Sequence, residues 1–327
     1  MTFWGRLSAP MSVRVLIATR SFGSTSPKPW DVLAQAGYET IRADLTQKMT
    51  EERLIALLDD VDGAIIGAMP MTARVFEGAP KLKVVSTHGV GFDHVDLEAA
   101  ARHGVIVANC PGANDQAVAD LAIGLMVCLA RQVVPANRDL RNGEWKNYQG
   151  NELWQKTLGL IGLGRIGRAV ARRAGGFDMN VLAYDPFVDA RQAEAAGTRP
   201  ASFDEVISSA DYLSLHLVLN DQTRNIIGKK ELERMKPSAF LINTARGGLV
   251  DEDALYTALE AGKLAGAALD VFSEEPPLEQ GLLYLPNVVA TPHIGAHSKE
   301  AIERVGVLAA QNVVQALQTG EPVFRVV

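Results

Sequence analysis

The sequence contains little cysteine: Cys110 and Cys128 are the only two among 327 residues. They form no CxxC motif and no cluster with histidines at the spacing of zinc ligands, which argues against a disulfide scaffold and leaves no metal site to expect. Because free thiols persist in reducing compartments, the expected location is cytoplasmic.

The sequence also lacks a long apolar run, a secretory leader and an excess of positive charge. The longest apolar stretch, residues 117–130, contains Asp120 and is shorter than the roughly 18 residues that a membrane span requires, so it predicts a buried helix and no membrane association. No secretory signal is expected at the start of the sequence, where Met11 is an alternative first residue. The net charge of −6 disfavours nucleic acid as a partner.

What is present is the composition of a folded globular protein, with 47% hydrophobic and 21% charged residues. At roughly 150 residues per domain, the length predicts two domains. From residue 13 onward, short β-rich apolar runs alternate with amphipathic segments of about ten residues, which is typical of βαβ units in parallel sheets.

The alternation falls into two series that are separated near Pro111. The first series has strand candidates at 13–18, 63–67, 83–86 and 105–107, with helices such as 50–58 and 97–103. The second has strand candidates at 158–163, 181–184, 212–215, 239–243, 266–269 and 288–290. An amphipathic helix at 299–317 follows with no strand after it, so we expect it to pack back on the first series.

A glycine-rich loop, GLGRIG, follows the strand predicted at 158–163. Gly162 suits a tight turn, Gly164 the close approach of a pyrophosphate, and Gly167 the packing of the next helix on the strand. Asp185 ends the following strand, where an acid accepts hydrogen bonds from the adenosine ribose hydroxyls. Loop, helix, strand and acid together predict a dinucleotide site rather than an ordinary glycine turn.

The acid also selects the cofactor. A carboxylate at Asp185 repels a 2′-phosphate, and Pro186 and Phe187 supply no Arg to bind one. NAD is therefore predicted rather than NADP.

Polar groups follow three of the later predicted strands. Arg246 lies on a glycine-flanked turn and has the planar guanidinium that grips a carboxylate with two hydrogen bonds. Glu274 and Glu275 follow the next strand, and His293 follows the last. Because ligands of open α/β sheets bind at the carboxyl ends of the strands, we expect these groups to meet there.

Each of these groups alone has an ordinary structural explanation, such as an Arg that extends to solvent, an acid in a solvated loop or a buried His with a partner. Together they supply what the oxidation of a 2-hydroxy acid needs. His293 serves as acid and base, a carboxylate fixes its tautomer, and Arg246 binds the substrate carboxylate. Glu275 and His293 are the pair that we predict.

The ordered motifs GLGRIG, Tyr184-Asp185-Pro186, NTARGG, DVFSEEP and TPHIGA, together with residues 87–93, resemble those of the D-isomer-specific 2-hydroxyacid dehydrogenase family. The resemblance extends over nearly the whole chain from about residue 13. It implies an α/β fold of two Rossmann-like domains. In this fold, a doubly wound NAD-binding domain over 111–292 is inserted into a flavodoxin-like substrate domain made of 12–110 and 293–327.

The resemblance also implies roles for single residues. Arg246, Glu275 and His293 are the catalytic group, and the backbone amides of Val90 and Gly91 hold the substrate carboxylate. The residues placed in the cofactor site are Gly162, Gly164, Arg165, Ile166, Gly167, Asp185, His216, Thr244 and Asp270. Members of the family form dimers through the segment around residues 114–145, so a homodimer is expected.

The sequence departs from one group within this family. Members that use 3-phosphoglycerate commonly have an Arg after the third strand, whereas residues 65–70 supply none; Arg74, Lys81 or Lys83 are the possible substitutes. No control by an appended regulatory domain is expected either. We therefore expect an NAD-dependent dehydrogenase of a small 2-keto or 2-hydroxy acid similar to hydroxypyruvate or glyoxylate. The alternatives are a D-3-phosphoglycerate dehydrogenase and an NAD(H)-sensing binding module.

Overall fold

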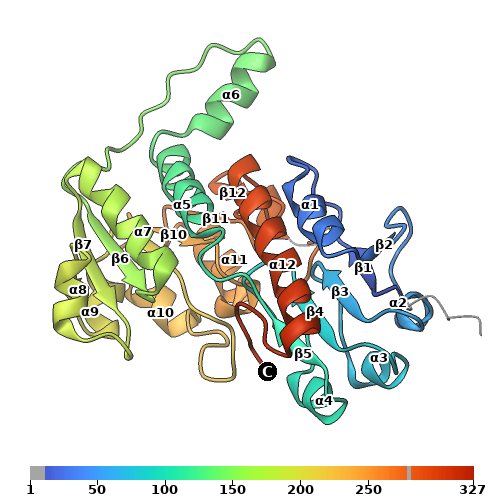
Figure 1. Ribbon diagram of the computed structural model, residues 1–327. Coiled ribbons are helices and arrows are strands. Elements are labelled where there is room, and N and C mark those ends of the chain that lie inside the picture. The colour runs from blue at the N-terminus through green and yellow to red at the C-terminus, as the bar shows by residue number, and fades with distance from the viewer. Residues whose placement is uncertain (1–11, 278–280) are drawn as a thin grey trace, which may run out of the picture. The chain divides into compact units, whose positions relative to one another are not determined.

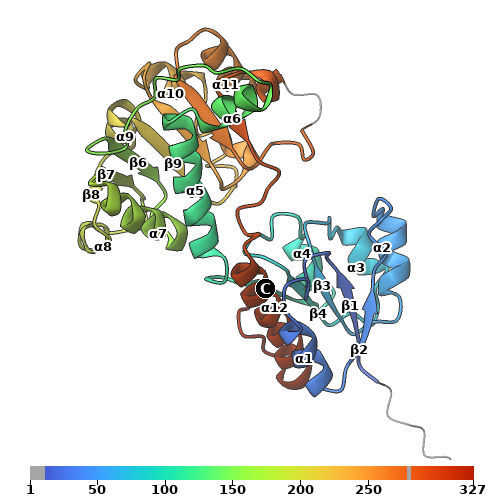
Figure 2. The same ribbon diagram turned by 90° about the horizontal axis from the view of Figure 1, so that it is seen from above.

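The computed structural model describes residues 12–277 and 281–327 (Figures 1 and 2), so the alternative start at Met11 lies outside the described residues. The chain divides into two compact units, one formed by the residues up to Asn114 with 297–327 and the other by 115–296. The divisions were expected at 110/111 and 292/293. The second lies further along the chain because the loop that carries His293 is hydrogen-bonded to Asp270 of the second unit.

The first unit is a five-stranded sheet with helices on both faces. Its strands are all parallel and lie in the order β2-β1-β3-β4-β5, which is the flavodoxin-like order. Its elements are β1 (Arg14–Ala18), α1 (Lys28–Gln35), β2 (Glu39–Arg42), α2 (Glu51–Leu58), β3 (Gly63–Ile66), α3 (Ala73–Glu77), β4 (Val84–Thr87), α4 (Leu97–Arg102), β5 (Ile106–Ala108) and α12 (Lys299–Thr319).

Side chains of the central strands of this sheet alternate between two apolar cores. Leu16 and Val85 pack with α2, α3 and α4, whereas Val15 and Val84 pack with α1 and α12. Figure 2 shows α1 and α12 together on one side of the sheet. Residues from the two ends of the first unit's chain therefore share one core.

The second unit is a seven-stranded sheet, also parallel throughout, in the order β12-β11-β10-β9-β6-β7-β8. The order reverses between β6 and β9, as in a doubly wound dinucleotide-binding fold. Its elements are α5 (Asp115–Ala130), α6 (Val133–Arg141), β6 (Thr157–Ile161), α7 (Arg165–Ala174), β7 (Asn180–Tyr184), α8 (Ala190–Ala195), β8 (Arg199–Pro200), α9 (Phe203–Ser209), β9 (Tyr212–Leu215), α10 (Lys229–Arg234), β10 (Phe240–Asn243), α11 (Glu252–Glu260), β11 (Gly266–Leu269) and β12 (Val288–Ala290).

Helices cover both faces of this second sheet. Leu160 and Ile242 face α5 and α7, and Leu213 and Leu241 face α9, α10 and α11. The predicted buried helix at 117–130 is therefore α5, a core helix of the second unit. Both units have the parallel α/β architecture that the sequence predicts.

A segment of the second unit projects beyond α5. Figure 1 shows α6 and a long connection that returns from it to β6. The carboxylate of Asp139 on α6 accepts hydrogen bonds from the Lys146 ammonium (2.7 Å) and the Tyr148 hydroxyl (2.5 Å), and these bonds hold its pKa well below the usual range. The connection is thus tied back to α6.

Among the described helices, none is by itself both long and apolar enough to cross a bilayer. Helices α5 and α6 together have sufficient length and apolar composition, but the pair is bent by 65° at the break between them.

Candidate active site

The glycine loop after β6 has the geometry that the motif predicts. Gly162 has a φ of +96°, and a Cβ there would lie 2.5 Å from the carbonyl oxygen of His216. A Cβ on Gly167 would lie 2.3 Å from the carbonyl oxygen of Gly162, so the start of α7 packs directly on the loop. A Cβ on Gly164, by contrast, would meet nothing within 4 Å. The side of Gly164 is therefore free of protein atoms, as the close approach of a pyrophosphate to the helix N-terminus requires.

Asp185, at the end of β7, is hydrogen-bonded to this loop. Its Oδ2 accepts from the N–H of Leu163 at 2.8 Å, and its Oδ1 accepts from the N–H of Phe187 at 2.9 Å. The carboxylate is thereby fixed beside the loop, and a small pocket of about 170 Å³ lies next to it. Arg165 and Ile166 are the first two residues of α7. These residues fit NAD, with a negative charge at the place where a 2′-phosphate would lie.

His216 lies under the glycine loop at the end of β9. Its Nε2 is 3.0 Å from the hydroxyl of Ser214, and burial lowers the pKa of His216 to about 4. The imidazole is therefore neutral at physiological pH, and in this structure it supports the loop.

His293 follows β12, and Glu275 follows β11. Nδ1 of His293 lies 2.8 Å from Oε2 of Glu275, and Oε1 of Glu275 accepts from the N–H of Phe272 at 3.1 Å. The hydrogen bond to Glu275 raises the pKa of His293 above its usual value. Burial favours a neutral Glu275, but the hydrogen bonds from His293 and Phe272 outweigh it and lower the pKa of this carboxyl. Glu275 therefore fixes the tautomer of the His293 imidazole, and this imidazole can exchange a proton near neutral pH.

Asp270 holds the turn that carries His293. Its backbone carbonyl accepts from the N–H of His293 (2.8 Å), and its carboxylate accepts from the N–H groups of Ile294 and Gly295 (2.8 Å each) and the hydroxyl of Thr291 (2.5 Å). His293 has a φ of +52°, in the left-handed region that costs free energy for a residue with a side chain. Asp270, predicted at the nicotinamide end of the cofactor site, thus stabilises a strained backbone at the candidate acid.

Arg246 follows β10 on a turn fixed by its neighbours. The side chain of Asn243 donates to the carbonyl of Arg246 (2.7 Å) and accepts from the N–H of Ala245 (3.1 Å). The next residue is packed against the loop that leads to Glu275, because a Cβ on Gly247 would lie 1.9 Å from the carbonyl carbon of Phe272. The positive charge of Arg246 acts on both members of the pair: it favours the charged form of Glu275 and opposes protonation of His293, whose pKa is nevertheless raised by the hydrogen bond to Glu275.

The hydroxyl of Thr244, between β10 and Arg246, is buried and makes no hydrogen bond to any described residue. A buried polar atom without a partner is costly unless a ligand satisfies it. Thr244 therefore fits the cofactor role that the sequence implies for it.

Val90 and Gly91 lie in the first unit, in the loop after β4. The carbonyl of Val90 accepts from the side chain of Asn109 at 2.8 Å. Within residues 12–277 and 281–327, the backbone N–H groups of Val90 and Gly91 make no hydrogen bond. Two adjacent backbone N–H donors are a kind of group that can bind an anion.

The predicted residues of the second unit therefore share the carboxyl edge of one sheet, whereas Val90 and Gly91 lie at the carboxyl edge of the other. The sequence analysis gave no role to Thr291 or Asn109, although Thr291 donates to Asp270 and Asn109 donates to Val90. Thr291 lies within the motif TPHIGA, which was the available signal for it, whereas Asn109 lies in none of the quoted motifs.

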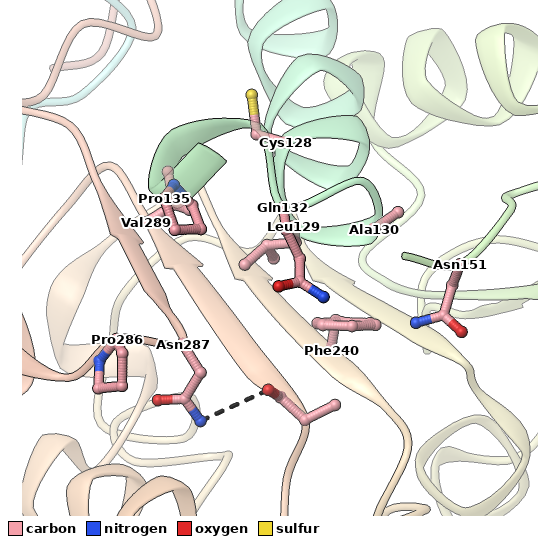
Figure 3. A pocket seen from close by; sticks show the side chains of 11 residues that line it. Cys128, Leu129, Ala130, Gln132, Pro135, Asn151, Phe240, Pro286, Asn287 and Val289 are labelled. Carbon is pink, nitrogen blue, oxygen red and sulfur yellow. Dashed lines mark hydrogen bonds between the residues drawn. The ribbon is translucent and has the colours of Figure 1, made fainter. Parts of the chain in front are cut away.

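A pocket of about 380 Å³ lies at the opposite edge of the second sheet (Figure 3). Phe240 is the first residue of β10, and Asn287, which donates to the carbonyl of Ala265 (3.4 Å), directly precedes β12. The amino ends of the parallel strands lie at the edge of the sheet opposite the glycine loop, so this pocket is separate from the candidate active site.

In the described part of the chain, no group of three or more His, Cys, Asp or Glu side chains is arranged to hold a metal ion.

Comparison with known proteins gives the family. Residues 123–295 match the family model described as "D-isomer specific 2-hydroxyacid dehydrogenase, NAD binding domain". The chain is 43% identical over 284 residues to the D-3-phosphoglycerate dehydrogenase of Methanocaldococcus jannaschii, which covers 86% of this chain and 54% of that protein. The chain belongs to the D-isomer-specific 2-hydroxyacid dehydrogenase family, and residues 123–295 correspond to its NAD-binding domain. It spans about half the length of the curated relatives that it matches.

Solved structures match nearly the whole length of the chain. The TT0316 protein from Thermus thermophilus has a TM-score of 0.86 and 37% identity, covering 96% of this chain and all of that one. A glyoxylate reductase from Paecilomyes thermophila has a TM-score of 0.86 and 33% identity, covering 97% of this chain and 99% of that one. These matches confirm the two-domain α/β fold.

Proposed function

We propose that the protein is an NAD-dependent D-2-hydroxyacid dehydrogenase that acts on small, unphosphorylated acids similar to hydroxypyruvate and glyoxylate. The observation that carries the proposal is the 2.8 Å contact between His293 and Glu275 at the same sheet edge as the glycine loop. When bound, the nicotinamide supplies or accepts a hydride.

Each catalytic residue has one task in this proposal. Glu275 holds Nδ1 of His293, so Nε2 is the nitrogen that gives a proton to the developing alkoxide in reduction and removes it in oxidation. Arg246 binds the substrate carboxylate and polarises the C2 oxygen. The N–H groups of Val90 and Gly91, in the first unit, are the other proposed donors to a substrate carboxylate.

The two parts of the chain divide these tasks. The inserted part, expected at 111–292, binds NAD, which the family match over 123–295 supports. The parts at 12–110 and 293–327 form the substrate domain. The turn that carries His293, at the start of the second of these parts, is hydrogen-bonded to the inserted part.

The cations of the first unit support an unphosphorylated substrate. Arg74 pairs with Glu52 (2.7 Å), Lys83 pairs with Asp62 (2.9 Å), and Lys81 pairs with Asp60. Lys81 and Lys83 precede β4, at the amino edge of the sheet, whereas Val90 and Gly91 follow it. Lys81 and Lys83 therefore lie at the edge of this sheet away from the Val90 loop, and Arg74 is engaged with Glu52.

A second candidate function is D-3-phosphoglycerate dehydrogenase. It is favoured by relatives of that name with 41% to 43% identity. In this case Arg20, which follows β1 at the carboxyl edge and donates to the carbonyl of Leu45, would be the cation that a phosphate meets.

We further propose a homodimer that forms through α6 and the connection after it. Val133, Val134 and Leu140 are exposed, and Trp145 is 93% exposed, on a segment that Asp139 braces. Exposed apolar side chains gathered on one segment are typical of an interface. Sedimentation analysis of Trp145→Ser with Leu140→Ser should give a monomer, while Phe187→Ser, which removes a different exposed aromatic ring, should leave the dimer intact.

The proposed location is the cytoplasm, and the two cysteines support it. Cys110 is buried and Cys128 is partly buried, and neither forms a disulfide. Cys110 has its pKa raised to about 12 by burial, so it is an inert thiol.

The experiment that tests the proposed activity is the rate of NADH oxidation by the purified protein with glyoxylate, hydroxypyruvate, phosphohydroxypyruvate and larger 2-keto acids. Preference for an unphosphorylated acid is the expected result. Preference for phosphohydroxypyruvate would establish the second candidate. Binding of NADH without turnover of any of these acids would contradict the proposed activity and indicate an NAD(H)-sensing module.

A further inference from the structure

The direction of the two N–H groups proposed to bind the substrate carboxylate is determined by the carbonyls that precede them. In a planar trans peptide the carbonyl and the N–H point in opposite directions. The N–H of Val90 shares a peptide plane with the carbonyl of Gly89, and the N–H of Gly91 shares one with the carbonyl of Val90. Whatever holds these two carbonyls therefore aims the two donors.

Both carbonyls are held from one side. The carbonyl of Gly89 accepts from the backbone N–H of Cys110 at 2.9 Å and from the hydroxyl of Thr87 at 3.1 Å. The carbonyl of Val90 accepts from the side-chain amide of Asn109 at 2.8 Å. The segment after β5 thus turns both N–H groups away from itself.

Asn109 is itself anchored through its backbone. Its N–H donates to the carbonyl of Phe324 at 3.3 Å, and its carbonyl accepts from the side-chain amide of Asn312 at 2.8 Å. Asn312 is fully buried on α12, and its Oδ1 accepts from the N–H of Phe324 at 3.0 Å. The side chain of Asn109 therefore extends from a backbone that is fixed on both sides.

We infer that Asn109 is a positioning residue for the substrate carboxylate. Asn109 acts through the Val90–Gly91 peptide and is itself supported by Asn312. The inference rests on the proposed function and deepens it, because it names the group that prepares the carboxylate site. A pre-aligned donor avoids the cost of ordering the peptide when substrate binds.

The side chain at 109 must donate a hydrogen bond. An Asp at this position would place a carboxylate against the carbonyl of Val90, and that repulsion favours rotation of the peptide plane and loss of the Gly91 donor. A Ser is too short to reach the carbonyl and leaves the peptide unsupported. Both variants keep the anchored backbone of residue 109, which makes them informative.

The test compares the wild type with Asn109→Asp and Asn109→Ser. The readouts are KM and kcat for the best 2-keto acid, the dissociation constant of oxamate in the NADH complex, and the dissociation constant of NADH. We expect KM and the oxamate constant to rise about 10-fold or more, as for loss of one hydrogen bond to a charged group, with kcat and NADH binding within about 3-fold. Asn180→Asp, at an exposed position of the second unit, is the charge-matched control.

Unchanged KM and oxamate binding in both Asn109 variants of an active enzyme would overturn the inference. A loss of NADH affinity equal to the loss of oxamate affinity would also overturn it, because that result indicates general damage to the fold. Failure of the wild type to reduce any 2-keto acid would instead refute the proposed function on which the inference rests.

Discussion

Oε2 of Glu275 lies 2.8 Å from Nδ1 of His293, and this hydrogen bond is the main reason that the pKa of His293 is raised. In the proposed reduction His293 carries the proton that is transferred, so a raised pKa of His293 should preserve activity to higher pH. Without the carboxylate the pKa of His293 falls, and the proton is lost at lower pH. We predict that Glu275→Gln moves the alkaline limb of the kcat/KM profile for 2-keto acid reduction to lower pH.

The neighbouring acid provides the control for this measurement. Glu274 is exposed and precedes Glu275 directly. Glu274→Gln should leave the alkaline limb in place. If the two variants gave the same profile, Glu275 would not be the partner that determines the protonation of His293.

Asp270 should contribute both to stability and to catalysis. Its buried carboxylate accepts hydrogen bonds from Thr291, Ile294 and Gly295, and an Asn can satisfy only part of this set. We predict that Asp270→Asn lowers the free energy of unfolding by about 1 to 3 kcal/mol, the cost of leaving a buried hydrogen-bonding group unsatisfied. It should also lower kcat, because the His293 turn loses its support.

The matched substitution for this prediction is Asp251→Asn. Asp251 caps α11 by accepting from the N–H of Ala254, and Asn caps helices about as well as Asp. Urea denaturation and steady-state kinetics of this variant should resemble those of the wild type. Wild-type kcat in Asp270→Asn would show that the turn keeps its geometry without the carboxylate.

Two glycines of the GLGRIG motif should respond differently to substitution by Ala. A Cβ on Gly164 meets no protein atom within 4 Å, so Gly164→Ala should keep the wild-type Tm but weaken NADH binding, since the methyl group occupies space left for the pyrophosphate. A Cβ on Gly167 would lie 2.3 Å from the carbonyl oxygen of Gly162, so Gly167→Ala should lower Tm. Thermal unfolding and NADH titration check both. Unchanged NADH affinity in Gly164→Ala would place the pyrophosphate elsewhere.

The charge at Asp185 should determine the choice between NADH and NADPH. We predict that Asp185→Ser lowers the ratio of kcat/KM with NADH to kcat/KM with NADPH by about 10-fold or more, because repulsion of the 2′-phosphate is removed. Asp189→Asn, which keeps the N-terminal cap of α8, should leave the ratio unchanged. An unchanged ratio in Asp185→Ser would remove this residue from cofactor selection.

Much of the fold could be predicted because its central strands are buried runs between clear breaks. The helix predicted at 299–317 is α12, and the strand predicted at 212–215 is β9. Strand β2 was not predicted, because Glu39–Arg42 is mostly exposed at a sheet edge and has no apolar pattern. The two-residue strand β8 is exposed as well and forms only through its pairing with β7.

The candidate site was predictable where the reactive side chains are part of a sequence motif, as for Glu275 and His293. It was not predictable where a side chain holds the backbone of the site in place. Nothing in the pattern around Asp270 shows that its carboxylate would bind three groups of the His293 turn. Likewise, the contact of Asn109 with Val90 joins residues that only the pairing of β4 with β5 brings together.

The most direct test of the central claim is the reduction of the preferred 2-keto acid by His293→Asn. Asn tolerates the positive φ of position 293, so the backbone is preserved, but its side chain cannot serve as an acid. We predict that kcat falls by about 10²- to 10⁴-fold while the dissociation constant of NADH stays within about 2-fold. Retention of the wild-type kcat would contradict the role of His293 as the proton donor.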